Sequence, residues 1–240
     1  MITSIQNAFI KTTKKLHMKK YRDQEDSLLI EGFHLIEEAE KAKLIKTIFL
    51  TKPHPDYPEA TLTSPHVLKH LLQVDHQPQA AAIIKKPKPD QAGKQVLILE
   101  NIQDPGNVGT LIRSALAFGF DTVVSIQSAD IYSLKVLRST QGAIFKLNIH
   151  ISDIQTFKTQ YPNHTLIGAH LGQKASLTKR PVQPFALVLG NEGQGLSKET
   201  IAQLDDTITI PIENIDSLNV GVAGSIIMHA ITQTQPLLRD

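Results

Sequence analysis

The chain has 240 residues, of which 41% are hydrophobic and 20% are charged, so it is long enough for one or two folded domains and its composition argues against disorder. It contains no cysteine, which excludes disulfides, thiolate metal sites and cysteine nucleophiles. The N-terminal residues lack the apolar stretch of a secretory signal, and residues 217–238 are too polar to span a membrane. We therefore expect a soluble, cytoplasmic protein.

The net charge of +2 is unevenly distributed along the chain. Six basic residues and no acidic residue lie between Lys11 and Arg22. A basic segment on a near-neutral chain is typical of a protein in which one domain binds a polyanion and another carries out chemistry. A solvated, lysine-rich helix face has the same pattern, so charge alone leaves both interpretations open.

The first part of the chain has a mixed α/β pattern. Ser64 followed by Pro65 is a typical helix start, because serine caps the first turn and proline fits its first position. The predicted elements of this part are helices over residues 6–20, 32–42 and 66–72 and strands over residues 27–30, 44–50 and 80–84.

A linker follows these elements. Residues 85–93 contain two prolines, one glycine and three lysines, a composition typical of a connection between domains. We place the boundary near residue 90, which predicts one domain over residues 1–90 and a second over residues 91–240.

The second part alternates apolar strands with helices more regularly. Continuous apolar strands separated by helices predict a parallel sheet covered on both faces, so the fold class is α/β. The predicted strands cover residues 96–99, 122–126, 165–169, 185–189 and 207–210, and the predicted helices cover residues 108–118, 131–137, 197–204 and 218–231.

Three segments at the ends of these strands are candidates for ligand loops: residues 104–109, 190–195 and 210–225. The second has the spacing G-x-x-G-x-G, and its three glycines indicate a tightly folded backbone or the close approach of a ligand. Neither G-x-G-x-x-G nor G-x-x-x-x-G-K-[ST] occurs, so neither a dinucleotide-binding turn nor a phosphate-binding P-loop is supported. Each segment alone is more often ordinary turn chemistry.

Together, the three segments resemble the motifs of the SpoU-type (TrmH-like) RNA ribose methyltransferases of the SPOUT superfamily. Residues 100–119 are similar to the first motif, residues 189–196 to the second and residues 210–223 to the third, in the family's order. The first part of the chain resembles the RNA-binding domain often found ahead of this catalytic domain, through Asn7 with the basic helix, residues 30–36 and residues 82–87.

The third motif departs from the family pattern at two places. Four residues without a glycine separate Ile212 from Ser217, where the family usually has five including one glycine. Gly221 occupies a position where serine is common. Both departures concern the shape of the cofactor loop.

The resemblance implies transfer of a methyl group from S-adenosylmethionine to a ribose 2′-hydroxyl. It implies a C-terminal SPOUT domain with a parallel sheet and a trefoil knot, preceded by a smaller α/β RNA-binding domain of a ribosomal-protein type. It also implies a homodimer, and the nearly uncharged helix predicted over residues 218–231 suits such an interface. The expected substrate is 23S ribosomal RNA, and tRNA is the alternative.

The resemblance also assigns site residues by position. Cofactor contacts, mainly through the backbone, fall on Gly190, Ile210 and Leu218, with Asn191, Glu192 and Asn219 nearby. The candidates for contacts to RNA phosphates are Lys11, Lys14, Lys15, Lys19 and Arg22.

The first motif supplies two candidate catalytic residues, Asn107 and Arg113. Arginine is protonated at physiological pH, so a role as general base needs an unusual environment or help from an RNA phosphate. We expect Arg113 to orient the target ribose and to stabilise negative charge that develops on the 2′-oxygen, while Asn107 positions the loop and the arginine. Glu192 is expected to anchor Arg113, to pair with Asn107, or simply to face water.

Other candidate sites are weaker. His66 and His70 have the i,i+4 spacing of metal ligands, with His76 close in sequence, but without cysteine a polar helix face is the better interpretation and we expect no metal. The rival functions are a non-catalytic RNA-binding homologue, which the altered third motif favours, and a nicotinamide-linked enzyme, which the missing G-x-G-x-x-G disfavours.

Overall fold

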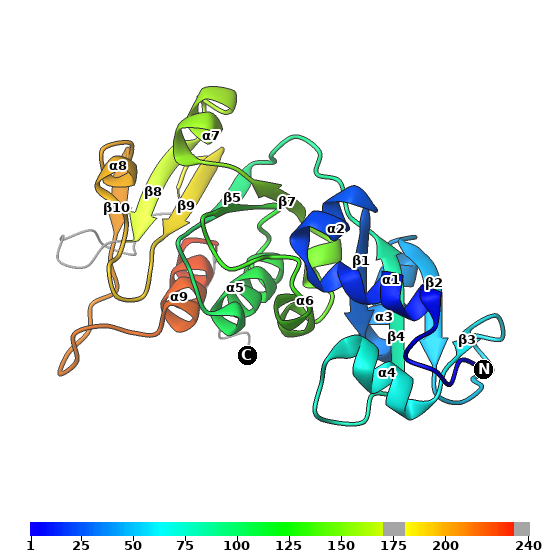
Figure 1. Cartoon of the computed structure of the whole chain (residues 1–240). Coiled ribbons are helices and arrows are strands. Elements are labelled where there is room, and N and C mark those ends of the chain that lie inside the picture. Colours follow the sequence, from blue (N-terminus) through cyan, green and yellow to red (C-terminus); the bar gives the residue numbers. More distant parts are fainter. Residues whose placement is uncertain (170–180, 233–240) are drawn as a thin grey trace, which may run out of the picture. The chain divides into compact units, whose positions relative to one another are not determined.

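The computed structural model describes residues 1–169 and 181–232 of the chain (Figure 1). These residues belong to two compact units. The first unit contains residues 1–87 and 132–145, and the second contains residues 88–131 together with the described residues from 146 onward. Each unit has its own sheet.

The first unit has a four-stranded sheet in the order β1-β4-β2-β3. Strand β4 pairs antiparallel with both β1 and β2, and the short β3 adds to β2 in parallel. The strands are β1 (Ser27–Glu31), β2 (Ile45–Leu50), β3 (Thr61–Leu62) and β4 (Ala80–Lys85).

Helices cover both faces of this sheet. The side chains of Leu29, Phe49 and Ala81 form a core cluster with buried residues of α1 and α4. Strand residues alternate between faces, and α3 contacts the same strands without joining that cluster, so α3 packs on the opposite face. The helices of this unit are α1 (Ala8–Lys14), the 3-10 turn η1 (Lys15–His17), α2 (Lys19–Gln24), α3 (Phe33–Lys41), α4 (Pro65–Leu72), α6 (Leu134–Thr140) and the 3-10 turn η2 (Ala143–Phe145).

Two predictions for the first unit have opposite outcomes. The helix start at Ser64 is confirmed, since its hydroxyl accepts a hydrogen bond from the backbone N–H of Val67. The single helix over residues 6–20 is wrong, because Met18 adopts an extended backbone (φ −97°, ψ 130°) that separates η1 from α2.

Residues 132–145 belong to the first unit although they follow the predicted boundary near residue 90. Helix α6 contacts β1, and Leu134 packs against the first core cluster. The guanidinium of Arg138 donates to the buried carboxylate of Glu31 over 3.0 Å. The chain therefore contributes to the first unit twice.

The second unit has a six-stranded parallel sheet, as the sequence predicts. Its order is β10-β8-β9-β5-β6-β7, and every neighbouring pair is parallel. Strands β9 and β6 flank β5 on either side. Every residue of these two strands is buried, which explains their continuous apolar sequences. The strands are β5 (Gln95–Glu100), β6 (Thr122–Ile126), β7 (Asn148–Ile151), β8 (Thr165–Ala169), β9 (Phe185–Leu189) and β10 (Asp206–Ile208).

Helices pack on this sheet as well. Phe157 of α7 joins strand residues such as Ile98 and Val188 in a core cluster. Helix α9 packs closely against α5, and a β-carbon at Gly224 would lie 2.4 Å from a methyl carbon of Leu111 and 2.5 Å from one of Leu189. The helices of this unit are α5 (Pro105–Ala117), α7 (Ile154–Gln160), α8 (Lys198–Ile201) and α9 (Val220–Thr232).

Several predicted boundaries in the second part need correction. Helix α5 begins three residues earlier than predicted, because Asp104 caps it by accepting from the N–H of Asn107. Helix α8 ends at Ile201 rather than at Leu204, and α6 begins at Leu134 rather than at residue 131. Strands β3 and β7 and helix α7 were not predicted. These elements are short, and β7 and α7 alternate apolar and polar residues too briefly to give a clear period.

Phe157 offers a test of the second core. Its side chain is 2% exposed, so Phe157→Ala should lower the free energy of unfolding by about 3–5 kcal/mol through lost burial and a residual cavity. Urea unfolding followed by circular dichroism measures this change. Ile151→Ala is the matched control, because Ile151 is 54% exposed and its replacement should change stability by no more than about 0.5 kcal/mol. Equal losses in the two variants would contradict the described core.

Candidate functional site

Three loops meet at one edge of the parallel sheet. Strands β5, β9 and β10 run in the same direction, so the segments that follow Glu100, Leu189 and Ile208 leave the sheet at its carboxyl edge. Ligand sites of α/β sheets gather at this edge. The three segments are the same ones that the sequence singled out.

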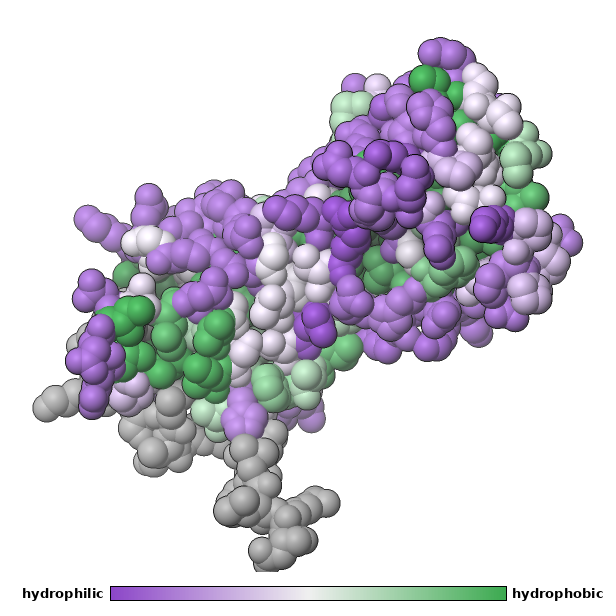
Figure 2. Space-filling view, turned by 90° about the horizontal axis from the view of Figure 1, so that it is seen from below, coloured by the Kyte–Doolittle hydropathy of each residue, from purple (hydrophilic) through white to green (hydrophobic). Residues whose placement is uncertain are grey.

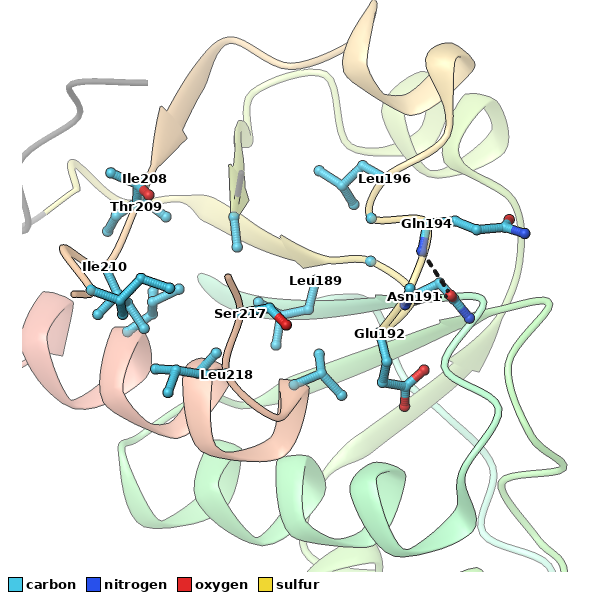
Figure 3. Close-up of a pocket in the computed structure, with 18 of the residues that line it drawn as sticks. Leu189, Asn191, Glu192, Gln194, Leu196, Ile208, Thr209, Ile210, Ser217 and Leu218 are labelled. Carbon is cyan, nitrogen blue, oxygen red and sulfur yellow. Dashed lines mark hydrogen bonds between the residues drawn. The ribbon is translucent and has the colours of Figure 1, made fainter. Parts of the chain in front are cut away.

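A cavity of about 310 Å³ lies between the second and third loops (Figure 3). Its volume is in the range of small-molecule sites. Among the residues that the structure describes, Glu192 is the one ionisable side chain in its lining. Most of the wall is apolar and includes Leu189, Leu196, Ile208, Ile210, Leu218 and Ile227.

The second loop is folded by its own hydrogen bonds. Asn191 and Gly195 exchange backbone N–H to carbonyl bonds of 3.0 and 2.9 Å. The Asn191 side chain accepts from the N–H groups of Gly193 and Gln194 and donates to the carbonyl of Asn101 over 2.8 Å. The amide of Asn191 thus holds the loop against the carboxyl end of β5.

Gly190 has no room for a side chain. A β-carbon there would lie 2.4 Å from the carbonyl carbon of Gly195 and 2.5 Å from the backbone nitrogen of Leu196. Because both are backbone atoms of the same loop, glycine is the residue that lets the loop close beside the cavity.

A chain of side-chain hydrogen bonds joins the three loops. The Asn219 amide donates to Oδ1 of Asn107 over 3.0 Å, and the Asn107 amide donates to Oε1 of Glu192 over 2.8 Å. Asn219 also accepts from the N–H of Val222 in the first turn of α9. Of the alternatives for Glu192, the structure therefore shows pairing with Asn107.

Arg113 lies on α5, the same helix as Asn107, and its side chain is exposed. Within the described ranges, no hydrogen bond or ion pair of its guanidinium is found. The guanidinium is therefore available to a bound substrate.

The structure also accounts for the two departures in the third motif. Asn214 adopts the left-handed conformation (φ 61°) that glycine commonly occupies, so the loop turns without a glycine. A β-carbon at Gly221 would lie 3.1 Å from Oδ1 of Asn219 and 3.4 Å from Oδ1 of Asn107. A serine there would contact both amides, and glycine leaves that space open.

Sequence reasoning did not single out Glu100. Its carboxylate is buried and accepts hydrogen bonds from the N–H and hydroxyl of Ser197, at 3.0 and 2.8 Å, and from the hydroxyl of Thr200. These bonds connect the end of β5 to the start of α8 and so hold the far end of the second loop. The signal was an acidic residue at the end of an apolar strand, because a buried carboxylate needs partners.

The predicted RNA-contact residues divide into two groups. Lys11, Lys15 and Lys19 are exposed and Lys14 is partly exposed. Arg22 is 2% exposed, and its guanidinium donates to the carbonyls of Leu16 and His17, so it does not face a ligand in solution.

In residues 1–169 and 181–232 there is no group of three metal-ligating side chains, and His70 accepts a hydrogen bond from Lys14 rather than pairing with His66. No helix in this part of the chain is long and apolar enough to cross a membrane.

The fold and the cavity define an α/β protein with a small-molecule site at the carboxyl edge of a parallel sheet. Comparison with family models then identifies the family: residues 94–229 match the SpoU rRNA Methylase family, and residues 7–91 match the MRM3-like substrate binding domain. The chain belongs to the SpoU rRNA methylase family. The resemblance stated from its three motifs is confirmed, and the enzyme class is a SpoU-type RNA methyltransferase.

Individual relatives agree with this assignment. The chain is 32% identical to the 23S rRNA (guanosine(2553)-2′-O)-methyltransferase RlmP of Bacillus subtilis, over 95% of this chain and 97% of the relative. A crystal structure of an RNA 2′-O ribose methyltransferase superposes with a TM-score of 0.80 at 26% identity, covering 96% and 97% of the two chains. The AdoMet-bound rRNA methyltransferase from Sinorhizobium meliloti has the same fold, with a TM-score of 0.82, 24% identity and 96% of each chain covered.

The role of Glu100 can be tested by stability. Glu100→Ala removes three hydrogen bonds to a charged group and leaves the polar groups of Ser197 and Thr200 without their acceptor, so the free energy of unfolding should fall by about 3 kcal/mol. Urea unfolding is the measurement. Glu199→Ala removes an exposed carboxylate from the first turn of α8, the helix that begins after Ser197. It should lower the free energy of unfolding by no more than about 1 kcal/mol. Similar losses would contradict the assigned role.

Proposed function

We propose that the protein transfers a methyl group from S-adenosylmethionine to the 2′-hydroxyl of a ribose in structured RNA, and that this RNA is 23S ribosomal RNA. The observation that carries the proposal is the hydrogen-bond chain from Asn219 through Asn107 to Glu192 beside the cavity. It brings the three family motifs together at one site. The Bacillus subtilis relative is named as a 23S rRNA methyltransferase, which favours ribosomal RNA over tRNA.

The cavity suits S-adenosylmethionine. Its apolar wall fits the faces of an adenine ring, and the loop at Gly190, where the backbone of Gly195 leaves no room for a side chain, lines one side of it. We assign cofactor contacts to Gly190, Ile210 and Leu218. When bound, the cofactor supplies an activated methyl group, because its sulfonium gives up the methyl group and departs as a neutral thioether.

Glu192 has a double task in this proposal. One carboxylate oxygen accepts from Asn107, and the side chain lines the cavity as its one charge in the described structure. A carboxylate at that place attracts the positively charged cofactor. Asn191 and Asn219 act through the loops that they hold, since their amides are committed to neighbouring groups.

Arg113 is our candidate catalytic residue. Its free guanidinium is exposed on the helix that also carries Asn107, and it offers two parallel donors to an RNA phosphate or ribose. It would orient the 2′-hydroxyl for in-line attack on the methyl carbon and stabilise the negative charge that develops on the oxygen as its proton passes to an RNA phosphate oxygen or to water. Asn107 positions the start of the same helix.

The domain organisation is part of the proposal. Residues 1–90 form the substrate-binding domain and residues 91–240 the methyltransferase domain, with residues 132–145 of the latter completing the compact first unit. We propose the exposed lysines of residues 11–19 as RNA contacts and leave Arg22 out because it is buried.

We further propose a cytoplasmic homodimer with a trefoil knot in its C-terminal domain. Val222 and Ile226 lie one turn apart on α9 and are 49% and 39% exposed. In the view of Figure 2, hydrophobic side chains also gather on one face of the second unit. An apolar helix face of this kind is suited to association with a second copy.

The reaction can be tested directly. Purified protein is incubated with S-adenosylmethionine carrying a labelled methyl group and with unmodified large-subunit ribosomal RNA or tRNA, and the digested nucleosides are analysed by mass spectrometry. A labelled 2′-O-methyl nucleoside from ribosomal RNA supports the proposal. Label in tRNA alone would change the substrate, label on a base would overturn the ribose assignment, and no transfer to either RNA would favour the non-catalytic homologue.

Substitutions of Arg113 should separate charge from geometry. Arg113→Ala should lower the rate of methyl transfer by about 100-fold or more through loss of transition-state stabilisation, with cofactor affinity unchanged. Arg113→Lys should recover only part of the rate, because an ammonium lacks the paired donors. Lys94→Ala, at the amino end of β5, is the control. Nearly full turnover in Arg113→Lys would show that two parallel donors are not required.

A pair of glycine substitutions should separate cofactor binding from folding. Gly190→Ala forces its β-carbon against the backbone of Gly195, so we expect at least about a tenfold loss of S-adenosylmethionine affinity in calorimetry, or about 1.4 kcal/mol. Gly193→Ala is the matched control in the same loop, since its β-carbon would meet only Oδ1 of Asn191 at 3.7 Å. Unchanged affinity in Gly190→Ala would exclude this loop from the cofactor site.

A further inference from the structure

Helices α1 and α4 pack side by side in the first unit, although 50 residues separate them in the chain. The ammonium of Lys14 on α1 donates to Nε2 of His70 on α4 over 3.0 Å. The ring of His17, just after α1, donates to the carbonyl of Leu71 over 2.7 Å. Both helices use their apolar residues on the same core cluster, so their polar residues face outward together.

The outward residues of this pair of helices carry positive charge and no negative charge. Residues 1–22 and 60–74 contain no aspartate or glutamate. Within the part of the chain that the structure describes, Lys11, Lys14, Lys15 and Lys69 form no ion pair. We call the surface formed by the polar side chains of the two helices, together with Lys15 directly after α1, the α1–α4 face; its members are Lys11, Lys14, Lys15, His66, Lys69 and His70.

In the contact between Lys14 and His70, the neighbour of the ammonium is a neutral acceptor and not a carboxylate. Burial, and then the positive charge of Lys14 and the neighbouring His66, lower the pKa of His70 below its usual value. At neutral pH His70 therefore stays uncharged and accepts from Lys14, which holds the ammonium in place with its other donors facing outward.

We propose that the α1–α4 face binds the phosphate backbone of the RNA substrate, and that α4 contributes to it through Lys69 and His66 beside the lysines of α1. The proposal rests on the proposed function and deepens it, because it adds a second helix to a contact that the sequence placed on residues 11–22 alone. Cations from two adjacent helices form a broad positive surface, and the repeated charges of a nucleic-acid backbone fit such a surface.

The geometry also predicts what kind of recognition this face provides. Lysine ammoniums and imidazole N–H groups contact phosphate oxygens without reading base edges. The α1–α4 face should therefore contribute affinity that depends strongly on salt, and little sequence preference. The choice of the methylated nucleotide then falls to other parts of the molecule.

The test is the salt dependence of RNA binding by the full-length protein. The probe is a fluorescein-labelled hairpin transcript, and its anisotropy gives the affinity between about 50 and 200 mM salt. Lys69→Gln should make the negative slope of log affinity against log salt shallower by about one, as should Lys14→Gln. Lys69→Arg, which keeps the charge, should restore the slope of the unmodified protein.

Lys43→Gln is the matched control. Lys43 is an exposed lysine of the first unit that follows α3, on the opposite face of the sheet, so its replacement changes the net charge equally. Its slope should equal that of the unmodified protein. Equal slopes for Lys69→Gln and Lys43→Gln would overturn the proposal, and the face would then be free for another partner such as an acidic protein.

Methyl transfer measured on the same preparations separates this inference from the proposed function. Lys69→Gln should raise the KM for ribosomal RNA and leave kcat unchanged, because the face belongs to the first unit and the candidate catalytic residues belong to the second. If the unmodified protein and its variants bind the hairpin with the expected slopes but the unmodified protein transfers no methyl group, the proposed function is wrong and the RNA-binding role of the α1–α4 face is retained. If the unmodified protein transfers methyl groups and the KM of Lys69→Gln is unchanged, the RNA-binding role of the face is contradicted and the proposed methyl transfer is retained.

Discussion

The amide of Asn107 is the point on which the site depends. Its oxygen accepts from Asn219 and its nitrogen donates to Glu192, so one side chain fixes the loops that follow β5, β9 and β10 relative to one another. An amide can do this because it is both donor and acceptor, whereas an aspartate at the same place would face the Glu192 carboxylate with a second negative charge. The carboxyl edge of the parallel sheet brings the loops near, and Asn107 sets their spacing.

Around that amide, the polar groups divide into those that build the site and those that remain available. The amide of Asn191 forms hydrogen bonds with Asn101 and within its own loop, and the carboxylate of Glu100 accepts hydrogen bonds from Ser197 and Thr200. A site of this kind is rigid because each loop is held by more than one bond. Arg113 is the contrast, since it is exposed on a helix whose start is already fixed. This division supports a scaffold that positions a cofactor and leaves Arg113 available to the RNA.

In the first unit, burial separates cations that look equivalent in the sequence. Arg22 ends a run of basic residues, yet it lies in the interior and donates to the carbonyls of Leu16 and His17 at the turn between α1 and α2. Its task is to satisfy those carbonyls where the helix is interrupted. The lysines before it stay at the surface, and α4 adds its own lysine and histidines beside them.

The sequence by itself determined the α/β class, the parallel sheet of the second part, the three loops and the family, because apolar runs, glycine spacing and motif order are local properties of the chain. It also determined the helix start at Ser64, since a cap needs only a serine, a proline and the residues that follow. It did not determine that Met18 interrupts the first helix or that β7 and α7 exist, because short elements form only where tertiary packing stabilises them.

Only the tertiary structure decided what each polar side chain touches. From the sequence, the partner of the Glu192 carboxylate was Arg113, Asn107 or water. The fold brings residues 107 and 192 within hydrogen-bond distance and so selects Asn107. Glu100 acquired a role only when α8 was placed over the end of β5, and residues 132–145 joined the first unit through contacts such as those of Arg138 and Leu134. Such contacts link residues far apart in the chain, and their partners are set by packing rather than by any local pattern of sequence.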